Sequence, residues 1–530
     1  MDARKIPLVV GVTGHIALRP ADQDALRMSV LSELKRMKSG FPHSEIVMLT
    51  SLAAGGDLLC ADVARELGIP ILAALPMAAE EYRRDFSDVD AARFDDHCAC
   101  AEWVGVVSPM ECMPEHPVRS DYYRQATLYV VAHSHVLIAL WDGSAPDKHR
   151  CGTGAAVDFA LRGIFDPQRG GSVHRGAAGQ VVHILAPRDP ADDRTAGEVR
   201  YLRDEATLRS ILDPIETFNG LRHTGGGTLL TDEACAGDPV LARMNGLYHA
   251  ASGLSRSFAG TYRRVLALLA AASTLLTFAF LIYDEVEAIW MILVCGAMLG
   301  AALFCRRYAV RSDCHRRYIE YRALAEWLRV QAYLRYAGSR LRVTSLLTWT
   351  QSLETSWIAA ALRAVTIGPE PETAHNIRQC WVDVQRDYHL RASRRTSLSI
   401  ARSERVVRFA LILSASLYVA ALVFELLFGG LSPKPLTVLG NIEGYRTLLK
   451  VALGTLSAAT IFIANYYGKQ SLPRKQSDHG KMAAFYARIS EMLGEYGQSE
   501  ALLEHLAREE LIENGNWLSY QRDNTPDISL

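Results

Sequence analysis

The sequence lacks a net charge. Its 57 lysines and arginines nearly cancel its 58 aspartates and glutamates, so no overall electrostatic field favours nucleic acid or an acidic substrate as a partner. The sequence also lacks the regular cysteine spacing of a disulfide framework, because its ten cysteines are scattered along 530 residues. Scattered cysteines are typical of reduced thiols in a cytoplasmic compartment. We therefore expect cytoplasmic regions that do not bind nucleic acid.

A secretory signal peptide is not expected either. The apolar run at residues 6–10 is too short for the core of such a signal and predicts a buried strand instead. A tetrahedral metal site is not expected, because residues 95–100 (Asp-Asp-His-Cys-Ala-Cys) have no second paired motif and are typical of a polar helix face. The spacing reveals no Ser/His/Asp arrangement, and His133 and His135 are expected near a helix end. We expect no metal and no cofactor.

Long apolar runs, by contrast, are plentiful. Four of them approach the roughly 20 residues that a helix needs to cross a bilayer: Val265–Tyr283, Ala288–Cys305, Val406–Leu427 and Lys450–Tyr466. They form two pairs, each predicted to be a transmembrane hairpin. Basic residues flank both pairs, and the acidic residues of the first pair gather at its tip, so the positive-inside rule places the ends of the hairpins in the cytoplasm. Adjacent spans with basic flanks disfavour the alternative, a buried hairpin of a soluble protein.

Glu425 interrupts the third apolar run near its outer end. A carboxylate at membrane depth is costly and is by default a candidate functional residue, whereas an interfacial carboxylate reaches the lipid headgroups; both interpretations stay open. An aromatic-rich amphipathic helix pattern follows each hairpin, at residues 318–328 and 485–493. This repetition hints at an internal duplication. The tryptophans between the hairpins are expected to pack among cytosolic helices.

Ahead of the hairpins, strand and helix patterns alternate. The expected strands are Leu8–Val12, Glu45–Leu49, Ile69–Leu75, Glu102–Val107, Val136–Trp141 and Val181–Leu185, and the expected helices are Asp22–Lys38, Asp57–Leu67 and Ala155–Arg162. This alternation, with nearly continuous apolar strands, predicts an α/β domain with a doubly wound, Rossmann-like parallel sheet. In such sheets, ligands bind outside the carboxyl ends of the strands.

Three glycine-containing turns follow predicted strands, where a ligand would bind. Glycine lets the backbone approach a ligand closely, Thr13 offers a hydroxyl and His15 a donor. The helices that begin after the second and third turns have free N–H groups that favour a phosphate or carboxylate, although a glycine at such a turn can also serve chain reversal alone. The candidate ligand-binding residues are Gly11, Thr13, Gly14, His15, Ser51, Gly55, Gly56, Asp57, Asp142, Gly143, Gly152, Thr153 and Gly154.

The order of these motifs resembles that of the SLOG superfamily. The similar segments are Gly11–His15, Thr50–Asp57 with its helix, Leu75-Pro76 with Tyr82 and Asp85-Phe86, Val136–Gly143, and Gly152–Gly154. That superfamily takes in the DNA-processing protein DprA, the LOG phosphoribohydrolases and the N-terminal sensor region of melastatin-type TRP channels. The resemblance covers about a third of the chain. The architecture of the remainder resembles the SLATT-type membrane modules that accompany SLOG sensors in bacterial conflict systems.

The resemblance implies a pocket for a nucleotide-derived second messenger, such as an ADP-ribose derivative or a cyclic oligonucleotide. LOG enzymes cleave a phosphoribosyl bond with a glutamate that follows a glycine-rich turn and with a nearby arginine. This chain has Asp158 where that carboxylate would be sought and no clear partner arginine. Binding is therefore favoured over hydrolysis.

The main hypothesis is a membrane effector of prokaryotic antiviral immunity. A nucleotide messenger would bind the SLOG-like pocket and gate or form a pore, as a homo-oligomer in the inner (cytoplasmic) membrane with both terminal domains cytoplasmic. One alternative is a membrane-anchored nucleotide hydrolase or phosphoribohydrolase that uses Asp158 and Asp57; another is a scaffold that binds a protein partner. The expected domains are a nucleotide-sensing domain (1–190), a helical linker (191–255), a first hairpin with cytosolic helices (256–400), and a second hairpin with C-terminal cytosolic helices (401–530).

Overall fold

The computed structural model describes residues 2–110, 113–146, 151–163, 180–222, 225–285, 288–428, 441–469 and 472–523. The chain divides into two compact units. The first, here called the sheet unit, comprises Met1–Leu254, Glu320–His375 and Leu503–Gly515. The second, the hairpin unit, comprises Ser255–Ile319, Asn376–Leu502 and Asn516–Leu530. Each unit is therefore assembled from segments that are far apart in the sequence.

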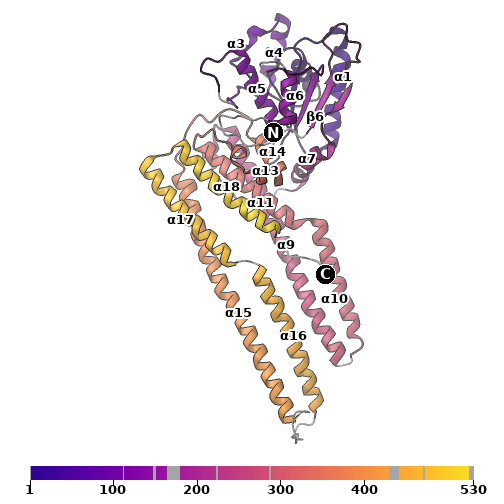
Figure 1. Ribbon diagram of the computed structural model, residues 1–530, viewed down its shortest axis with the longest axis vertical. Helices are drawn as coiled ribbons and strands as arrows, with labels where there is room; N and C mark the ends of the chain where they lie inside the picture. Colours follow the sequence, from indigo (N-terminus) through magenta and orange to yellow (C-terminus); the bar gives the residue numbers. More distant parts are fainter. Residues whose placement is uncertain are drawn as a thin grey trace. The chain divides into compact units, whose positions relative to one another are not determined.

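The sheet unit is built on a seven-stranded sheet (Figure 1). Its strands are β1 (Leu8–Gly14), β2 (Ile46–Thr50), β3 (Ile71–Leu75), β4 (Trp103–Val106), β5 (Val136–Trp141), β6 (Gln180–Leu185) and β7 (Val199–Tyr201). The strand order is β4-β3-β2-β1-β5-β6-β7, and every pairing is parallel except that of β6 with β7. The order reverses between β1 and β5, as in a doubly wound sheet. The predicted parallel sheet is confirmed, and the antiparallel β7 is an addition to it.

Helices surround this sheet. They are α1 (Gln23–Gly40), α2 (Gly56–Glu66), α3 (Ala79–Tyr82), α4 (Asp88–Cys100), α5 (Arg119–His133), α6 (Thr153–Arg162) and α7 (Glu205–Gly220). The three helices expected from the sequence correspond to α1, α2 and α6. Strands β2, β3 and β6 are buried along their whole length, because helices cover both faces of a parallel sheet and leave no polar alternation along its strands.

The central part of the segment between the two predicted hairpins belongs to the sheet unit. It contains the end of α11 (Cys314–Tyr336), then α12 (Val343–Leu346), α13 (Trp349–Glu354) and α14 (Ser356–Val365). Helix α14 packs against α5 and α7, and its Ala364 joins the same buried cluster as strand residues Val9 and Leu137. Trp357 is also buried. This segment, residues 320–375, is hereafter called the inter-hairpin segment.

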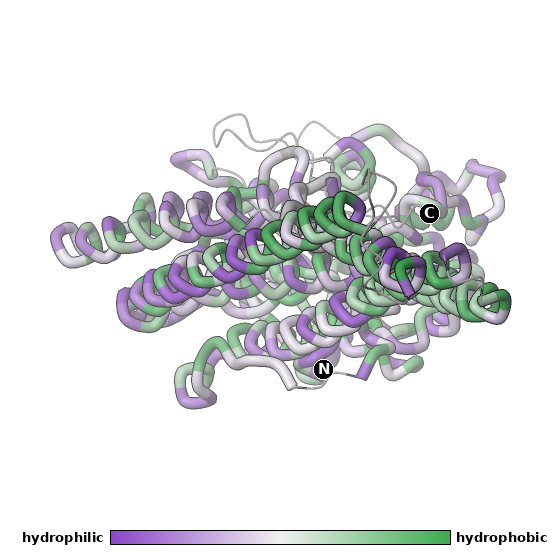
Figure 2. The backbone as a smooth tube through the Cα atoms, turned by 90° about the horizontal axis from the view of Figure 1, so that it is seen from below, coloured by the Kyte–Doolittle hydropathy of each residue, from purple (hydrophilic) through white to green (hydrophobic). Residues whose placement is uncertain are grey.

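The hairpin unit is helical. It contains most of α9 (Pro239–Glu285), α10 (Met291–Ser312), the π-helical turn η3 (Arg378–Asp383), α15 (Val384–Phe428), α16 (Ile442–Lys469), α17 (Leu472–Tyr496) and part of α18 (Glu500–Asp523). Among the described residues, three helical stretches are long and apolar enough to cross a membrane: Pro239–Glu285, Met291–Tyr336 and Arg378–Phe428. Figure 2 shows helical segments in which hydrophobic residues follow one another. The chain therefore has the character of a membrane protein. The fourth predicted span, 450–466, lies within α16 and stays a prediction.

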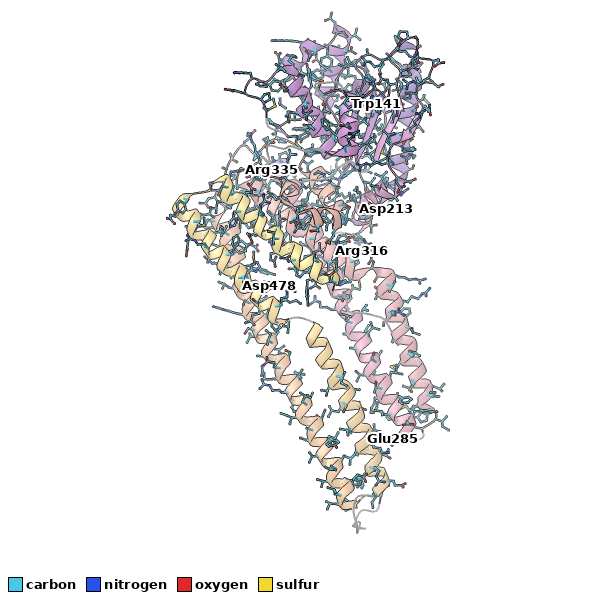
Figure 3. The ribbon with its side chains drawn as sticks, viewed as in Figure 1. Trp141, Asp213, Glu285, Arg316, Arg335 and Asp478 are labelled. Carbon is cyan, nitrogen blue, oxygen red and sulfur yellow. The ribbon has the colours of Figure 1, made fainter. Side chains whose placement is uncertain are left out.

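Contacts inside the hairpin unit tie the two pairs of helices together. Helix α15 packs against α16 and α17. A Cβ added at Gly454 would lie 2.9 Å from Leu281 Cδ1, so α16 and α9 approach closely there. Near the same level, Lys450 Nζ lies 2.9 Å from a carboxylate oxygen of Glu285, which Figure 3 labels at the end of α9. Residues 286–287 of the predicted acidic tip lie outside the described residues.

Candidate ligand-binding site

A cavity of about 370 Å³ lies beyond the carboxyl ends of β1, β2, β3 and β6. Its size falls within the range of roughly 300–1,000 Å³ that is typical of small-molecule sites. Its position beside β1, where the strand order reverses, is where doubly wound sheets bind ligands. Its walls come from the strand ends, from α5 and from the start of α6. The lining residues are Val12–Ile16, Ser51, Ala53, Ala54, Asp57, Pro76, Tyr82, Asp85, Phe86, Tyr123, Ala126, Thr127, Val130, Val131, Cys151–Thr153, Ala156 and Arg188.

The structure brings about half of the predicted site residues to this cavity. Those in its lining are Thr13, Gly14, His15, Ser51, Asp57, Gly152 and Thr153. Those outside its lining are Gly11, Gly55, Gly56, Asp142, Gly143 and Gly154. All three predicted turns therefore lie at or beside the cavity, but most of their glycines have another role.

That role is close backbone packing. Gly14, at the end of β1, meets Gly56, at the start of α2: a Cβ on Gly56 would lie only 2.7 Å from the Gly14 Cα. Gly55 has a φ of 76°, and a Cβ there would lie 2.2 Å from the Ile16 carbonyl oxygen. The Gly56 amide donates to the His15 carbonyl at 3.0 Å. These glycines let the β1 loop rest directly on the start of α2, beside the cavity.

The remaining glycines outside the lining are explained by similar crowding or by a positive φ. A Cβ on Gly11 would lie 1.9 Å from Ser134 Oγ, and one on Gly154 would lie 2.9 Å from the Ser144 carbonyl oxygen. Gly143 has a φ of 87°, a backbone conformation that favours glycine. The sequence pattern alone does not distinguish such packing glycines from ligand contacts.

Asp57 connects the loops that form the cavity floor. Its side chain accepts a hydrogen bond from the Thr50 hydroxyl at 2.9 Å and further ones from the backbone amides of Gly14, Ser51 and Ala53. Burial raises the pKa of Asp57 to about 7, although these hydrogen bonds oppose the rise. With donors from the ends of β1 and β2, the carboxyl group holds both loops against α2.

The loop after β2 also contains an unusual backbone conformation. Leu52 is completely buried and has a φ of 53°, in the left-handed region that residues other than glycine seldom occupy. The Leu52 amide donates a hydrogen bond to the Thr50 hydroxyl at 3.0 Å. Strained backbone of this kind is found preferentially at functional sites, and here it places Ser51 and Ala53 in the cavity wall.

His15 is oriented by Asp142 across the β1–β5 boundary. The Asp142 amide donates to His15 Nε2 at 3.1 Å, and an Asp142 carboxylate oxygen lies 3.1 Å from the same nitrogen. Burial lowers the pKa of His15 even though Asp142 opposes this, so the imidazole is neutral at pH 7. Asp142, predicted as a ligand contact, thus acts on the cavity through His15.

Two features of the cavity lining, the start of α6 and Arg188, favour an anion. At the start of α6, Gly152 is the N-cap and no side chain caps the helix, so the amides of Thr153 and Gly154 have no partners within the helix. Thr153 is 6 % exposed, lines the cavity, and forms no side-chain hydrogen bond with the described residues. Exposed Arg188 lines the same cavity and forms no ion pair with the described part of the chain. An anionic group is favoured here.

Aromatic rings form another part of the cavity. The rings of Tyr82 and Phe86 meet edge to face with centroids 5.0 Å apart. Beside them, the Tyr123 hydroxyl donates to Asp85, and Arg119 reaches the same carboxylate at 2.7 Å. The cavity therefore offers apolar ring surface and a hydrogen-bonding carboxylate together. Tyr82, Asp85 and Phe86 belong to the segments on which the family resemblance was based.

Sequence analysis missed the contribution of α5 and two further residues. The cavity-lining side chains of α5 are spaced by three and four residues, which places them on one helix face, but an apolar face of this kind predicts a buried core equally well. Arg188 follows β6 and belongs to none of the sequence motifs. The missed polar or aromatic lining residues are Tyr123, Thr127, Cys151 and Arg188.

Two predicted acids lie elsewhere. Asp158, the carboxylate sought for hydrolysis, lies outside the cavity lining and pairs with Arg162 at 2.8 Å, one helical turn later. Glu425 forms a two-pronged ion pair with Arg446 of α16, with distances of 2.5 and 2.9 Å. Glu425 therefore links α15 to α16.

Among the described residues, no group of three or more His, Cys, Asp or Glu side chains is arranged to hold a metal ion. Residues 95–100 lie in α4, and there His97 bonds to Asp62 at 2.8 Å. The nine cysteines in the described part of the chain are free thiols.

No protein-family model matches this chain, and no curated protein is significantly similar to it. The resemblance to SLOG and SLATT proteins accordingly stays a prediction based on the motifs quoted above.

Proposed function

We propose that this protein binds a nucleotide-derived ligand in the cavity of the sheet unit and that binding changes the state of its membrane helices. As the SLOG and SLATT resemblances imply, we place it among the membrane effectors of prokaryotic antiviral immunity, acting as a homo-oligomer in the inner membrane. The ligand class is an ADP-ribose derivative or a cyclic oligonucleotide. The pore or channel activity belongs to the same proposal.

The chemistry of the cavity supports a nucleotide. A phosphate suits the uncapped start of α6 with Thr153 and Arg188. A base suits the ring surface of Tyr82 and Phe86. The carboxylate of Asp85 can accept hydrogen bonds from sugar hydroxyls. These three features line one cavity. A nucleotide is a ligand that uses all three, because it combines a phosphate, a base and a sugar.

The connection between the cavity and the membrane helices carries the gating part of the proposal. Helix α5 lines the cavity through residues 123–131, and near its end His133 Nε2 lies 2.8 Å from Arg342 of the inter-hairpin segment. Arg342 lies, in sequence, between the second candidate span, which ends at Tyr336, and the third, which begins at Arg378. A ligand that shifts α5 would therefore act on the chain that joins these spans. The ligand must bind the two states with different affinity for this to occur.

The test uses the full chain in phospholipid vesicles that contain a fluorescent ion reporter. Candidate nucleotides are added to wild-type protein, to Thr153→Val, and to the matched control Thr207→Val, which alters an exposed threonine. We expect leakage that depends on one nucleotide, an about tenfold weaker response for Thr153→Val, and no change for the control.

Two outcomes would contradict the proposal. Tight nucleotide binding without any leakage would refute gating, and the absence of any nucleotide-induced thermal shift would refute the ligand class. Release of free base or ribose phosphate from the added nucleotide would support the hydrolase alternative, for which Asp57 is the only predicted acid that lines the cavity.

A further inference from the structure

A second, smaller cavity in the sheet unit is lined by charged side chains. It has a volume of about 30 Å³ and lies between Tyr129 of α5 and two stretches of the inter-hairpin segment, 339–342 and 366–371. Three arginines, at positions 335, 340 and 342, contribute to its lining; Figure 3 labels Arg335. Since about 10–15 Å³ of such space suffices for one water, the cavity has room for about two water-sized groups. We call it the arginine cavity.

Two of these arginines form ion pairs with carboxylates, one at a short distance and one at a long distance. Arg335 is compensated by Asp238, with Nε 2.6 Å from the carboxylate oxygen, and it donates to the Pro369 carbonyl at 2.7 Å. Arg340 is more loosely held, because its Nε lies 3.8 Å from a Glu370 oxygen. Glu370 also accepts a hydrogen bond from Ser108. The guanidinium of Arg340 therefore keeps most of its donors for another acceptor.

Arg342 has no anionic partner among the described residues. Its Nη1 lies 2.8 Å from His133 Nε2 and 3.3 Å from the Met110 sulfur, and its guanidinium lies over the Tyr129 ring at 5.5 Å. Burial and the Arg342 charge hold the pKa of His133 well below its ordinary value, so this partner is neutral.

A further arginine adds to the positive potential nearby. Arg363 lies in α14, one turn before the lining residue Thr366, and it forms no ion pair with the described residues. Burial lowers the pKa of Arg363 to about 10, a value at which the guanidinium still carries its charge at pH 7. A guanidinium removed from water without a counter-charge is costly, and a bound anion would offset that cost.

We propose that the arginine cavity is a second ligand site, which binds a tetrahedral oxyanion through Arg340 and Arg342. The ligand is inorganic phosphate or the phosphate group of a small metabolite, because planar guanidinium groups bind phosphate oxygens in pairs. The bound oxyanion joins α5, through Tyr129 and the His133 partner of Arg342, to the inter-hairpin segment. It thereby stabilises the contact through which we expect α5 to act on the membrane helices. The site itself does not depend on the nucleotide proposal.

The experiment measures phosphate binding by the full chain in detergent, with chloride added to keep ionic strength constant. Inorganic phosphate and ribose 5-phosphate are titrated separately, and binding is followed by thermal shift and by hydrogen exchange. The variants are Arg342→Gln and Arg340→Gln, with Arg222→Gln as the control at an exposed arginine of the same unit. Because the Arg340 side chain is 73 % exposed, Arg340→Gln tests the site without disturbing the core.

We expect phosphate to protect 339–342 and 366–371 from exchange. Arg342→Gln should weaken phosphate binding about tenfold or more and Arg340→Gln several-fold, while Arg222→Gln binds phosphate as the wild type does. Tighter binding of ribose 5-phosphate than of phosphate would identify the metabolite form; equal or weaker binding would identify the free ion.

Either of two results overturns the inference. One is wild-type phosphate affinity in both Arg340→Gln and Arg342→Gln. The other is an absence of protection at 339–342 and 366–371 at 10 mM of either probe (about 2.7 kcal/mol of binding free energy). Loss of phosphate binding in Thr153→Val alone would assign the phosphate to the larger cavity, which would support the proposed function and refute the second site.

Discussion

His135 is the residue whose protonation should most directly loosen the sheet unit. Its side chain is buried between β1 and the inter-hairpin segment, where Nδ1 accepts the Val9 amide at 3.0 Å and Nε2 donates to the Ala360 carbonyl at 3.2 Å. A neutral imidazole satisfies both contacts. A proton on Nδ1 would set two donors, this N–H and the Val9 amide, against each other. The hydrogen bond from Val9 would therefore be lost.

The size of the effect follows from the pKa. Burial lowers the pKa of His135 from 6.5 to about 4, so the unfolded chain takes up a proton at a higher pH than the folded chain does. The contribution of neutral His135 to the stability of the fold is therefore complete above pH 6.5 and is lost progressively as the pH falls towards 4. The two pKa values correspond to about 3.4 kcal/mol, or roughly 300-fold in the opening equilibrium.

Hydrogen exchange of the β1 peptide in the full-length protein measures this directly, because the Val9 amide is itself a partner of His135. Wild type, His135→Gln and the exposed control His43→Gln are compared from pH 4 to pH 7.5, with exchange times scaled to the intrinsic rate. We expect wild type and the control to lose protection by about two orders of magnitude more than His135→Gln.

The comparison between variants matters because other groups respond in the opposite direction. Burial raises the pKa of Asp57 and of Glu513 to about 7, so their contributions to stability grow as the pH falls. Equal pH dependence in wild type and His135→Gln would refute the argument, whatever the slope of the whole protein. A His135 imidazole signal that titrates near pH 6.5 in the folded protein would refute the argument as well.

Three further changes test particular features. Gly56→Ala should lower the free energy of unfolding by about 1–3 kcal/mol or more, since its Cβ would lie 2.7 Å from the Gly14 backbone; thermal unfolding checks this, and Gly40→Ala, with open space around the added Cβ, should be close to neutral. Asp57→Asn should remove the loss of stability that Asp57 causes as the pH rises from about 4 to 7; a pH series of thermal midpoints that matches wild type would contradict this. Glu425→Gln should destabilise the contact between α15 and α16, and in a double-mutant cycle with Arg446→Gln we expect a coupling of about 0.5–3 kcal/mol; no coupling would show that the ion pair is incidental.

Much of the sheet could be predicted because its signals are local. Continuous apolar runs such as Val136–Trp141 correspond to strands, and the glycine turns that follow them lie at the carboxyl edge of the sheet, as βα alternation requires. Length and apolar composition likewise indicate the helices that can cross a membrane. What these signals lack is information about which residues meet across the fold.

The details of the candidate site illustrate that limit. Gly56 and Thr153 come from equivalent turns, yet Gly56 packs against Gly14 while Thr153 lines the cavity. The cavity face of α5 has the same spacing as a core-facing helix, so its role emerged only when the space beside it was located. Strand β7 is three residues long, too short to be recognised by an alternating pattern.

The sequence by itself determined that a parallel α/β sheet precedes long apolar helices, because periodicity and length report local conformation and burial. The tertiary structure alone decided that the inter-hairpin segment joins the sheet unit, that Asp57 holds the loops of the cavity floor while most of the glycines serve close backbone packing, and that Arg342 meets a neutral histidine at a second cavity. These are contacts between residues far apart in the chain. Their partners depend on how whole elements pack, and no local pattern of residue types encodes that packing.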